Sequence, residues 1–238
     1  MHKTPAGARE LVGALLRQLA AEPPAEVLIL PPFTALEAVV EELGGDRRVR
    51  VGAQNCHHEA AGAFTGEIGA PMLAPFCDYV LVGHSERRHL MGESDEVVRR
   101  KLDAVLAAGL LPVLAVGETE ADRSAGTAEA VVERQTRAGL VGLTAGEIGS
   151  CTVAYEPVWA IGTGATATPD DAAGAAAVIH RVVAELSGGG ASVRVLYGGS
   201  VTPANAASLL SAPGVRGALV GGASLRADEF AAIVAAAG

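Results

Sequence analysis

Short apolar runs alternate with longer helical patterns along the whole chain, and this alternation constrains the fold more than any other feature. Each run is four to six residues long, which is typical of a strand buried on both faces. Parallel strands joined by helical crossovers form either an open doubly wound sheet or a closed barrel. Seven strands are predicted, at residues 26–30, 49–53, 79–82, 111–116, 151–155, 193–197 and 217–220.

Helical spacing of Leu, Val and Ala fills the segments around these strands. Thr4 is placed to cap the first helix, and Thr168 followed by Pro169 is a typical start for another. The predicted helices cover residues 5–21, 34–43, a short stretch near 70, 95–108, 127–141, 169–186, 203–210 and 225–236.

The ends of the strands favour a barrel over a dinucleotide-binding sheet. No GxGxxG motif follows the first strand, whereas polar residues and glycines follow nearly every strand. A barrel brings all of these ends to one face, where barrel active sites lie. The alternation runs without a break, so residues 1–238 are predicted to form a single domain. The residues at the strand ends are Gln54, Asn55, His84, Glu118, Glu156, Gly198 to Ser200, Gly221 and Gly222.

Charge and composition exclude several classes of function. The formal net charge is −9 and no Lys/Arg cluster is present, which argues against a nucleic-acid partner. No apolar stretch reaches the length of a membrane span, and the three cysteines are an odd number without CxxC spacing. We therefore expect free thiols and a cytoplasmic protein. His57 and His58 lack a third ligand at metal spacing, so no metal site is predicted.

Two strand ends carry residues suited to acid–base chemistry. Glu156 ends an apolar strand and is followed by Pro157 and a segment rich in glycine, which suits either a base beneath a moving lid or an ordinary strand end. His84 ends another strand before polar residues that could start a short helix. A helix N-terminus lowers the pKa of a neighbouring imidazole, so His84 is either a neutral electrophile or a surface histidine.

Glycines follow the last two strands, at Gly198-Gly199-Ser200 and Gly221-Gly222. Glycine lets backbone N–H groups approach a phosphate, and a short helix near Ala223 would point its positive end toward it. Ordinary turns also use glycine. Two such turns after adjacent strands favour a phosphate site.

Six segments together resemble the signature segments of the triosephosphate isomerase family, and they occur in the family order. VGHSERR (82–88) and AYEPVWAIGTG (154–164) are the most specific of the six. The others are GAQN (52–55), GAFTGE (62–67), YGGSV (197–201) and ALVGG (218–222).

The resemblance implies a TIM (β/α)8 barrel that interconverts dihydroxyacetone phosphate and glyceraldehyde 3-phosphate without metal or cofactor. By similarity, Glu156 is the base, His84 is the neutral electrophile, and Glu86 is a carboxylate close to both. Thr65 matches the residue that reaches into a partner subunit, which implies a homodimer. The implied lid spans residues 157–167 and includes Pro157, Val158, Trp159, Ala160, Ile161 and Thr163, and the implied phosphate ligands are Gly162, Ser200, Gly221 and Gly222.

The N-terminus departs from the family pattern. Residues 1–4 resemble the tail of the family's opening motif, so its first strand, Asn and catalytic Lys are expected upstream of residue 1. The favoured explanation is that the start is an internal Met of a longer protein. As it stands, the barrel would lack its first strand and leave unpaired edges at residues 26–30 and 217–220. Two alternatives remain: a non-catalytic remnant that binds phosphorylated ligands or a partner chain, and another phosphate-binding barrel isomerase.

Overall fold

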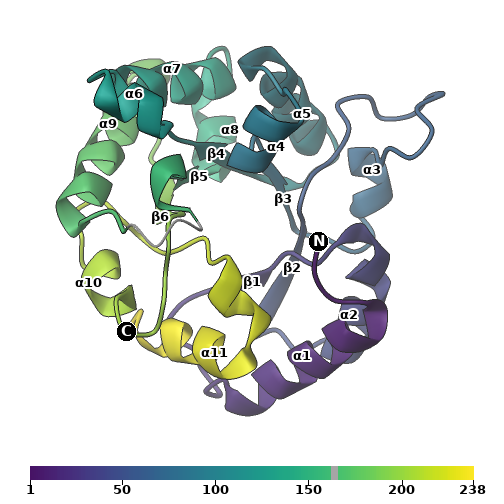
Figure 1. Ribbon diagram of the computed structural model, residues 1–238. Helices are drawn as coiled ribbons and strands as arrows, with labels where there is room; N and C mark the ends of the chain where they lie inside the picture. Colours follow the sequence, from purple (N-terminus) through teal and green to yellow (C-terminus); the bar gives the residue numbers. More distant parts are fainter. Residues whose placement is uncertain (162–165) are drawn as a thin grey trace.

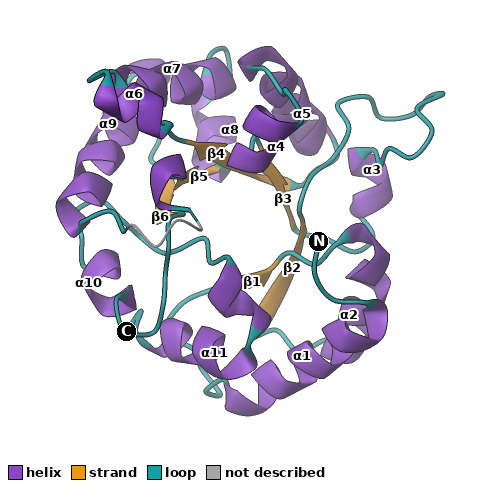
Figure 2. Cartoon of the chain, in the orientation of Figure 1, coloured by secondary structure: helices purple, strands orange, loops and turns teal. Residues whose placement is uncertain are grey.

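Six parallel strands form one curled sheet, with each strand paired to the next along the chain. A computed structural model describes residues 1–161 and 166–238. Helices surround the strands on the outside, as Figures 1 and 2 show. The strands are β1 (Val27–Ile29), β2 (Val49–Ala53), β3 (Tyr79–Val82), β4 (Leu111–Val116), β5 (Thr152–Tyr155) and β6 (Arg194–Tyr197).

The longer helices lie where the sequence predicts them, and two of them begin at the predicted cap. The side chain of Thr4 accepts from Gly7 N, and that of Thr168 accepts from Asp171 N. The longer helices are α1 (Pro5–Gln18), α2 (Leu36–Leu43), α5 (Asp95–Ala107), α7 (Ala128–Leu140), α9 (Pro169–Ser187) and α11 (Ala227–Ala235). Shorter ones are α3 (Ala70–Leu73), α4 (Ser85–Leu90), α6 (Glu120–Ser124), α8 (Ala145–Ser150) and α10 (Ala206–Leu210), with 3-10 turns η1 (Phe33–Ala35), η2 (Val158–Ala160) and η3 (Gly222–Leu225).

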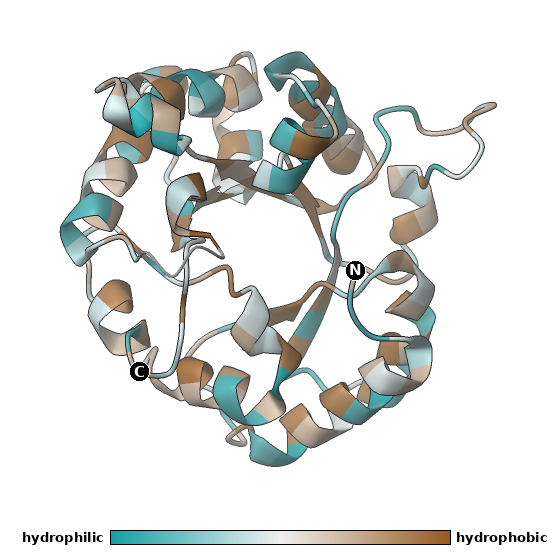
Figure 3. Ribbon diagram, in the orientation of Figure 1, coloured by the Kyte–Doolittle hydropathy of each residue, from teal (hydrophilic) through white to brown (hydrophobic). Residues whose placement is uncertain are grey.

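The core has two layers, separated by the sheet. In β3, Val80 and Val82 belong to the apolar cluster between strands and helices, whereas Tyr79 and Leu81 belong to a second cluster. This alternation follows from the two-residue period of a strand. Figure 3 shows hydrophobic residues along the strands and more polar residues on the outer helices.

The seventh predicted strand is wrong as an extended element. Residues 217–220 form a single bridge, between Ala218 and Tyr197. Two hydrogen bonds of 2.9 Å hold it, from Tyr197 N to Gly217 O and from Leu219 N to Tyr197 O. Among the described residues, no strand pairs with the other side of this segment, so its pairing is not extended.

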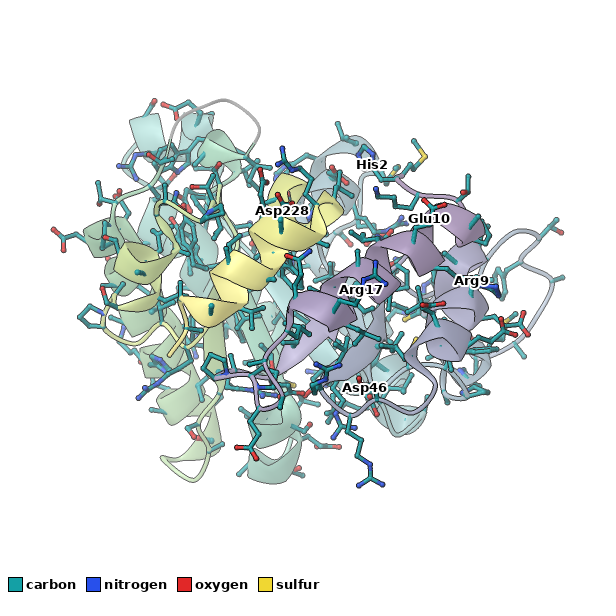
Figure 4. All side chains as sticks on the ribbon, turned by 90° about the horizontal axis from the view of Figure 1, so that it is seen from below. His2, Arg9, Glu10, Arg17, Asp46 and Asp228 are labelled. Atoms are coloured by element: carbon teal, nitrogen blue, oxygen red, sulfur yellow. The ribbon has the colours of Figure 1, made fainter. Side chains whose placement is uncertain are left out.

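The helical ring closes where the sheet does not. The sheet ends at β1 on one side and at residues 217–220 on the other, so the predicted unpaired edges are present in the described part of the chain. On the outside, α1 packs against both α2 and α11. Figure 4 shows α1 and α11 side by side, with Arg9 and Arg17 on the outer face of α1.

A polar cluster links distant strands at their N-terminal ends. Glu26, directly before β1, accepts a hydrogen bond of 2.7 Å from Tyr79 and pairs with Arg194 of β6 at 2.6 Å. Arg194 also donates to the Tyr79 hydroxyl at 3.1 Å. The cluster therefore ties the edge strand β1 to β3 and β6 through side chains.

Candidate active site

His84 is held at the end of β3 by a glycine turn and a buried arginine. Gly83 has a φ of +74°, and a Cβ there would lie 2.8 Å from an Arg88 nitrogen, so glycine is required. Arg88 donates to Gly83 O at 2.7 Å and to Ala115 O at 3.0 Å. The turn places His84 as the N-cap residue of α4.

The hydrogen bonds of His84 assign its tautomer. Glu86 N donates to His84 Nδ1 at 3.3 Å, so the proton of a neutral ring belongs on Nε2. Nε2 lies 3.0 Å from Oε1 of Glu156. The two residues singled out for acid–base chemistry are therefore in direct contact.

The prediction that the pKa of His84 is lowered is wrong for this arrangement. Burial acts to lower the pKa of His84, but the hydrogen bond and charge of Glu156, with a smaller contribution from Glu86, raise the pKa above its usual value. A carboxylate in contact with the ring favours the charged imidazolium. The carboxylates together therefore outweigh the effect of burial on the pKa of His84.

Glu86 lies at the margin of the site. Its Oε2 is 3.8 Å from His84 Nδ1, and its side chain is 70% exposed. In this arrangement Glu86 faces the ring nitrogen that is turned away from Glu156.

Glu156 is a buried carboxylate with several donors. Only 2% of the residue is exposed, and Ser85 donates to it from its backbone N–H at 2.9 Å and from its hydroxyl at 3.4 Å. The Glu156 N–H donates to Val116 O at 2.7 Å, which fixes the residue at the end of β5. Ser85 was not predicted as a site residue, although it directly follows His84 in the VGHSERR segment.

Glycines beside Glu156 make room for the base. A Cβ on Gly117 would lie 1.8 Å from Glu156 O, and one on Gly198 would lie 2.9 Å from Glu156 Cγ. Oε1 of Gln135, on α7, accepts a hydrogen bond from the Gly117 N–H at 2.8 Å, so this buried backbone donor has a partner. A Cβ on Gly199 would meet the Tyr197 hydroxyl at 2.2 Å. Gly198 and Gly199, which the sequence assigned to phosphate approach, are thus required by the close packing of the site itself.

Glu118 anchors the segment that follows the base. It is 1% exposed, and its Oε1 accepts from the Trp159 indole at 2.7 Å and from the Tyr155 hydroxyl at 3.0 Å. Val158 N donates to Glu118 O at 3.0 Å. The sequence placed Glu118 at a strand end but gave it no role. Its position after β4, next to the strand that carries Glu156, is the sequence feature that could have indicated this role.

The predicted lid is described in part. Pro157 to Ile161 form the turn η2 and its flanks, with Ala160 N donating to Pro157 O at 2.8 Å. Ala160 is buried, whereas Val158, Trp159 and Ile161 are partly buried. Gly162 and Thr163 lie outside the described residues.

The other predicted phosphate ligands follow β6 and the bridged segment 217–220. Ser200 comes shortly after β6, and its carbonyl accepts from the Asn205 side chain at 3.0 Å. Gly221 and Gly222 lie at the start of η3, and a Cβ on either would meet no atom within 4 Å. They share the C-terminal edge of the sheet with His84 and Glu156, and the space beside them is open.

Thr65 lies apart from these groups, on the loop of residues 54–69. His57 N donates to Ile68 O at 2.7 Å and closes the base of the loop, and the Phe64 ring packs at a tilt of 36° against His57 with ring centroids 4.4 Å apart. Thr65 is exposed, and the loop projects away from the ring in Figure 1.

Neither lysine of the chain joins the described site. Lys101 is buried and pairs with Glu93 at 2.5 Å and with Asn55 at 2.7 Å, and Lys3 lies before the first turn of α1. Within residues 1–161 and 166–238, no group of three or more His, Cys, Asp or Glu side chains is arranged to hold a metal ion. No helix in that same part of the chain has both the length and the apolarity needed to cross a bilayer.

The family model for triosephosphate isomerase matches residues 1–237. The chain belongs to the triosephosphate isomerase family. The triosephosphate isomerase of Symbiobacterium thermophilum is 51% identical over 240 residues, covering 100% of this chain and 93% of the relative. That of Roseiflexus castenholzii is 50% identical, covering 98% of this chain and 93% of the relative.

A solved member of the triosephosphate isomerase family has the same fold. The crystal structure of triosephosphate isomerase from Bartonella henselae matches with a TM-score of 0.87 and 39% identity, covering 99% of this chain and 94% of that one. The TIM barrel expected from the sequence is confirmed, with its sheet open between β1 and residues 217–220. Neither alternative, the non-catalytic remnant or another barrel isomerase, receives support from these comparisons.

Proposed function

We propose that this chain interconverts dihydroxyacetone phosphate and glyceraldehyde 3-phosphate, a step of glycolysis and gluconeogenesis. The observation that carries the proposal is the contact of His84 Nε2 with Glu156 Oε1, at 3.0 Å, on the C-terminal edge of the sheet. A base and a hydrogen-bond donor side by side are what proton transfer next to a carbonyl requires. Membership of the triosephosphate isomerase family supports the choice of substrate.

The reaction uses Glu156 and His84 in different roles. The Glu156 carboxylate takes a proton from the carbon next to the carbonyl, while the Nε2–H of His84 donates to the carbonyl oxygen and stabilises the enediolate that forms. Nε2 of His84 gives its proton to the former carbonyl oxygen and takes the proton of the neighbouring hydroxyl. Glu156 returns its proton to the neighbouring carbon, which completes the isomerisation.

The Glu156 side chain has to leave its resting partners before it can act. Its two oxygens accept from Ser85 at 2.9 and 3.4 Å, and Oε1 also faces His84. The backbone of Glu156 is fixed against Gly117, so the movement falls to side-chain rotation. Ser85 thus holds the base beside the reaction centre, and substrate binding turns the carboxylate toward the substrate carbon.

The phosphate group is assigned to the glycine turns. Gly221 and Gly222 have open space beside them, and η3 begins there. Ser200 and Gly162 complete the proposed set by family resemblance. Residues 157–167 are proposed to close over the substrate, which would exclude water from the enediolate.

A homodimer and a cytoplasmic location are part of the proposal. Phe64 is 45% exposed beside Thr65 on the projecting loop, which gives a partner subunit an apolar contact. The three cysteines are free and buried, which fits a reducing compartment.

A coupled assay with the purified chain tests the function. Conversion of glyceraldehyde 3-phosphate, followed by NADH oxidation through glycerol-3-phosphate dehydrogenase, is the expected result. Ribose 5-phosphate and glucosamine 6-phosphate are tested as a sugar phosphate and an amino-sugar phosphate that the alternative isomerase would convert. Turnover of one of these in place of the triose phosphate, or of none, would reject the proposal.

A further inference from the structure

Arg123 contacts one residue near the start of the proposed lid and one residue beyond its end. Its guanidinium carbon lies 4.2 Å from the centroid of the Trp159 ring, near the start of the segment. The same guanidinium pairs with Asp171 at 3.0 Å, just beyond the end of the segment. Arg123 lies on α6, so a third element joins these two residues.

The contact with Trp159 acts on an already anchored residue. The indole N–H donates to buried Glu118, so the ring is fixed at its edge, and Arg123 covers its face. A guanidinium over an indole face is attracted by the negative face of the ring. Movement of Trp159 away from Glu118 therefore also has to break the contact with Arg123.

The contact with Asp171 acts where the chain enters α9. One oxygen of Asp171 accepts from Thr168 N at 2.9 Å and from its hydroxyl at 2.8 Å, which forms the capping box of the helix. The other oxygen accepts from Arg123. The helix start that terminates the lid is thereby tied to the same cation that covers Trp159.

We propose that Arg123 is a positioning residue, a clamp that ties Trp159 to the first turn of α9 and acts on turnover through Trp159. The inference rests on the proposed isomerase function for its kinetic consequence, but the clamp itself does not depend on that function. Only Pro157 and Val158 separate Trp159 from Glu156 along the chain. Loss of the contact between Arg123 and Trp159 therefore loosens the backbone next to the base. We expect kcat to fall while KM stays nearly constant, because the contacts of Arg123 with Trp159 and Asp171 do not include Ser200, Gly221 or Gly222, the described phosphate ligands.

Trp159 is the only tryptophan of the chain, so its fluorescence reports the clamp directly. The test variant is Arg123→Met, which keeps an apolar cover over the ring and removes the cation. The matched control is Arg137→Met. Arg137 is 38% exposed against 41% for Arg123, and it also pairs with an acid of α9, Glu185.

The expected result has two parts. In Arg123→Met the Trp159 emission shifts to the red and its quenching by acrylamide increases, and kcat falls about three- to tenfold with KM within about twofold. Arg137→Met should match the wild type in Trp159 fluorescence and in kcat. Arg123→Lys keeps the charge without the planar stacking and should lie between the wild type and Arg123→Met, and it replaces Arg123→Met if that variant fails to fold.

Each departure from this pattern overturns the positioning role. Unchanged quenching would mean that Arg123 does not hold Trp159, and changed quenching with kcat equal to that of Arg137→Met would mean that holding Trp159 does not affect turnover. If the wild-type chain shows no isomerase activity, the proposed function fails, and the quenching comparison alone decides whether the clamp exists.

Discussion

Nε2 of His84 lies 3.0 Å from Oε1 of Glu156, so the proposed electrophile and the proposed base share a hydrogen bond within the site. The contact couples the charge of the ring to that of the carboxylate. It also explains why the pKa of His84 is raised although burial acts to lower it.

The first prediction concerns pH. Because folding raises the pKa of His84, the contact stabilises the fold below the unfolded pKa of 6.5, and this stabilisation is lost as the pH rises through the folded pKa. The difference in free energy of unfolding between the wild type and His84→Gln should therefore be larger at about pH 6 than at about pH 8.5, by urea denaturation. Over the same range kcat/KM should change in the opposite direction, since the neutral ring is the proposed electrophile. An equal difference at both pH values would contradict the raised pKa.

The second prediction separates the two carboxylates. Glu156→Asp withdraws the base by one methylene and should lower kcat about 100-fold or more with a small effect on KM. Glu86→Gln should lower kcat less than about tenfold, because that side chain is 70% exposed and its carboxylate is 3.8 Å from the ring. Steady-state kinetics of both variants provide the measurement. A larger loss in Glu86→Gln than in Glu156→Asp would reverse the assigned roles.

The third prediction concerns Gly117. An Ala side chain there meets Glu156 O at 1.8 Å, so Gly117→Ala should reduce the free energy of unfolding by about 1–3 kcal/mol and lower kcat by displacing the base. Gly174→Ala on α9 is the control, since a Cβ there meets nothing within 4 Å. The control should gain about 0.5–1 kcal/mol, because alanine is the better helix former. Similar free energies of unfolding for the two variants would show that the backbone of Glu156 can shift away from the new Cβ at little cost.

The fourth prediction concerns the polar cluster at the N-terminal ends of the strands. Burial acts to raise the pKa of Glu26, but hydrogen bonds from Tyr79 and Arg194 lower it overall. The stabilisation is present above the unfolded pKa of 4.5 and is lost as the pH falls through the folded pKa. Glu26→Gln should therefore lose about 1 kcal/mol or less at neutral pH, a small value because the pair is half exposed, and should match the wild type in acid. Chemical denaturation at both pH values is the measurement, and a loss that persists in acid would contradict the ionic origin.

The fifth prediction concerns the loop of residues 54–69. Thr65→Glu places a charge beside Phe64 on the proposed dimer contact, so it should shift the chain from the two-chain to the one-chain mass in sedimentation velocity. Ser208→Glu, on the exposed side of α10, should remain dimeric. A one-chain mass for the wild type would contradict the proposed homodimer.

The sequence was most informative where patterns are local. The helix starts at Thr4 and Thr168 follow from caps and the strand β3 follows from a short apolar run, and each is confirmed. The helices α6 and α8 were not predicted, because each is only five or six residues long and carries no apolar period. The segment 217–220 has the composition of a strand, but pairing depends on neighbours on both sides, which no local pattern reports.

The site was predicted in its residues but not in its contacts. His84 and Glu156 stand out as strand-end residues, yet the distance between them decides the direction of the His84 pKa, and that distance belongs to the tertiary structure. The same holds for Gly198. A Cβ at this position would lie 2.9 Å from Glu156 Cγ, and only the tertiary structure brings the two residues together. Glu118 was visible at a strand end, but only the indole of Trp159 gives it a role.

The contact between α1 and α11 joins the first helix of the chain to the last. Such a contact forms late in folding, because the whole intervening chain has to be ordered before its ends can meet. The apolar face of α1, with Val12 and Leu15, is complete only when α11 has joined the ring. A substitution that weakens the contact between α1 and α11 is therefore expected to speed unfolding more than it slows folding.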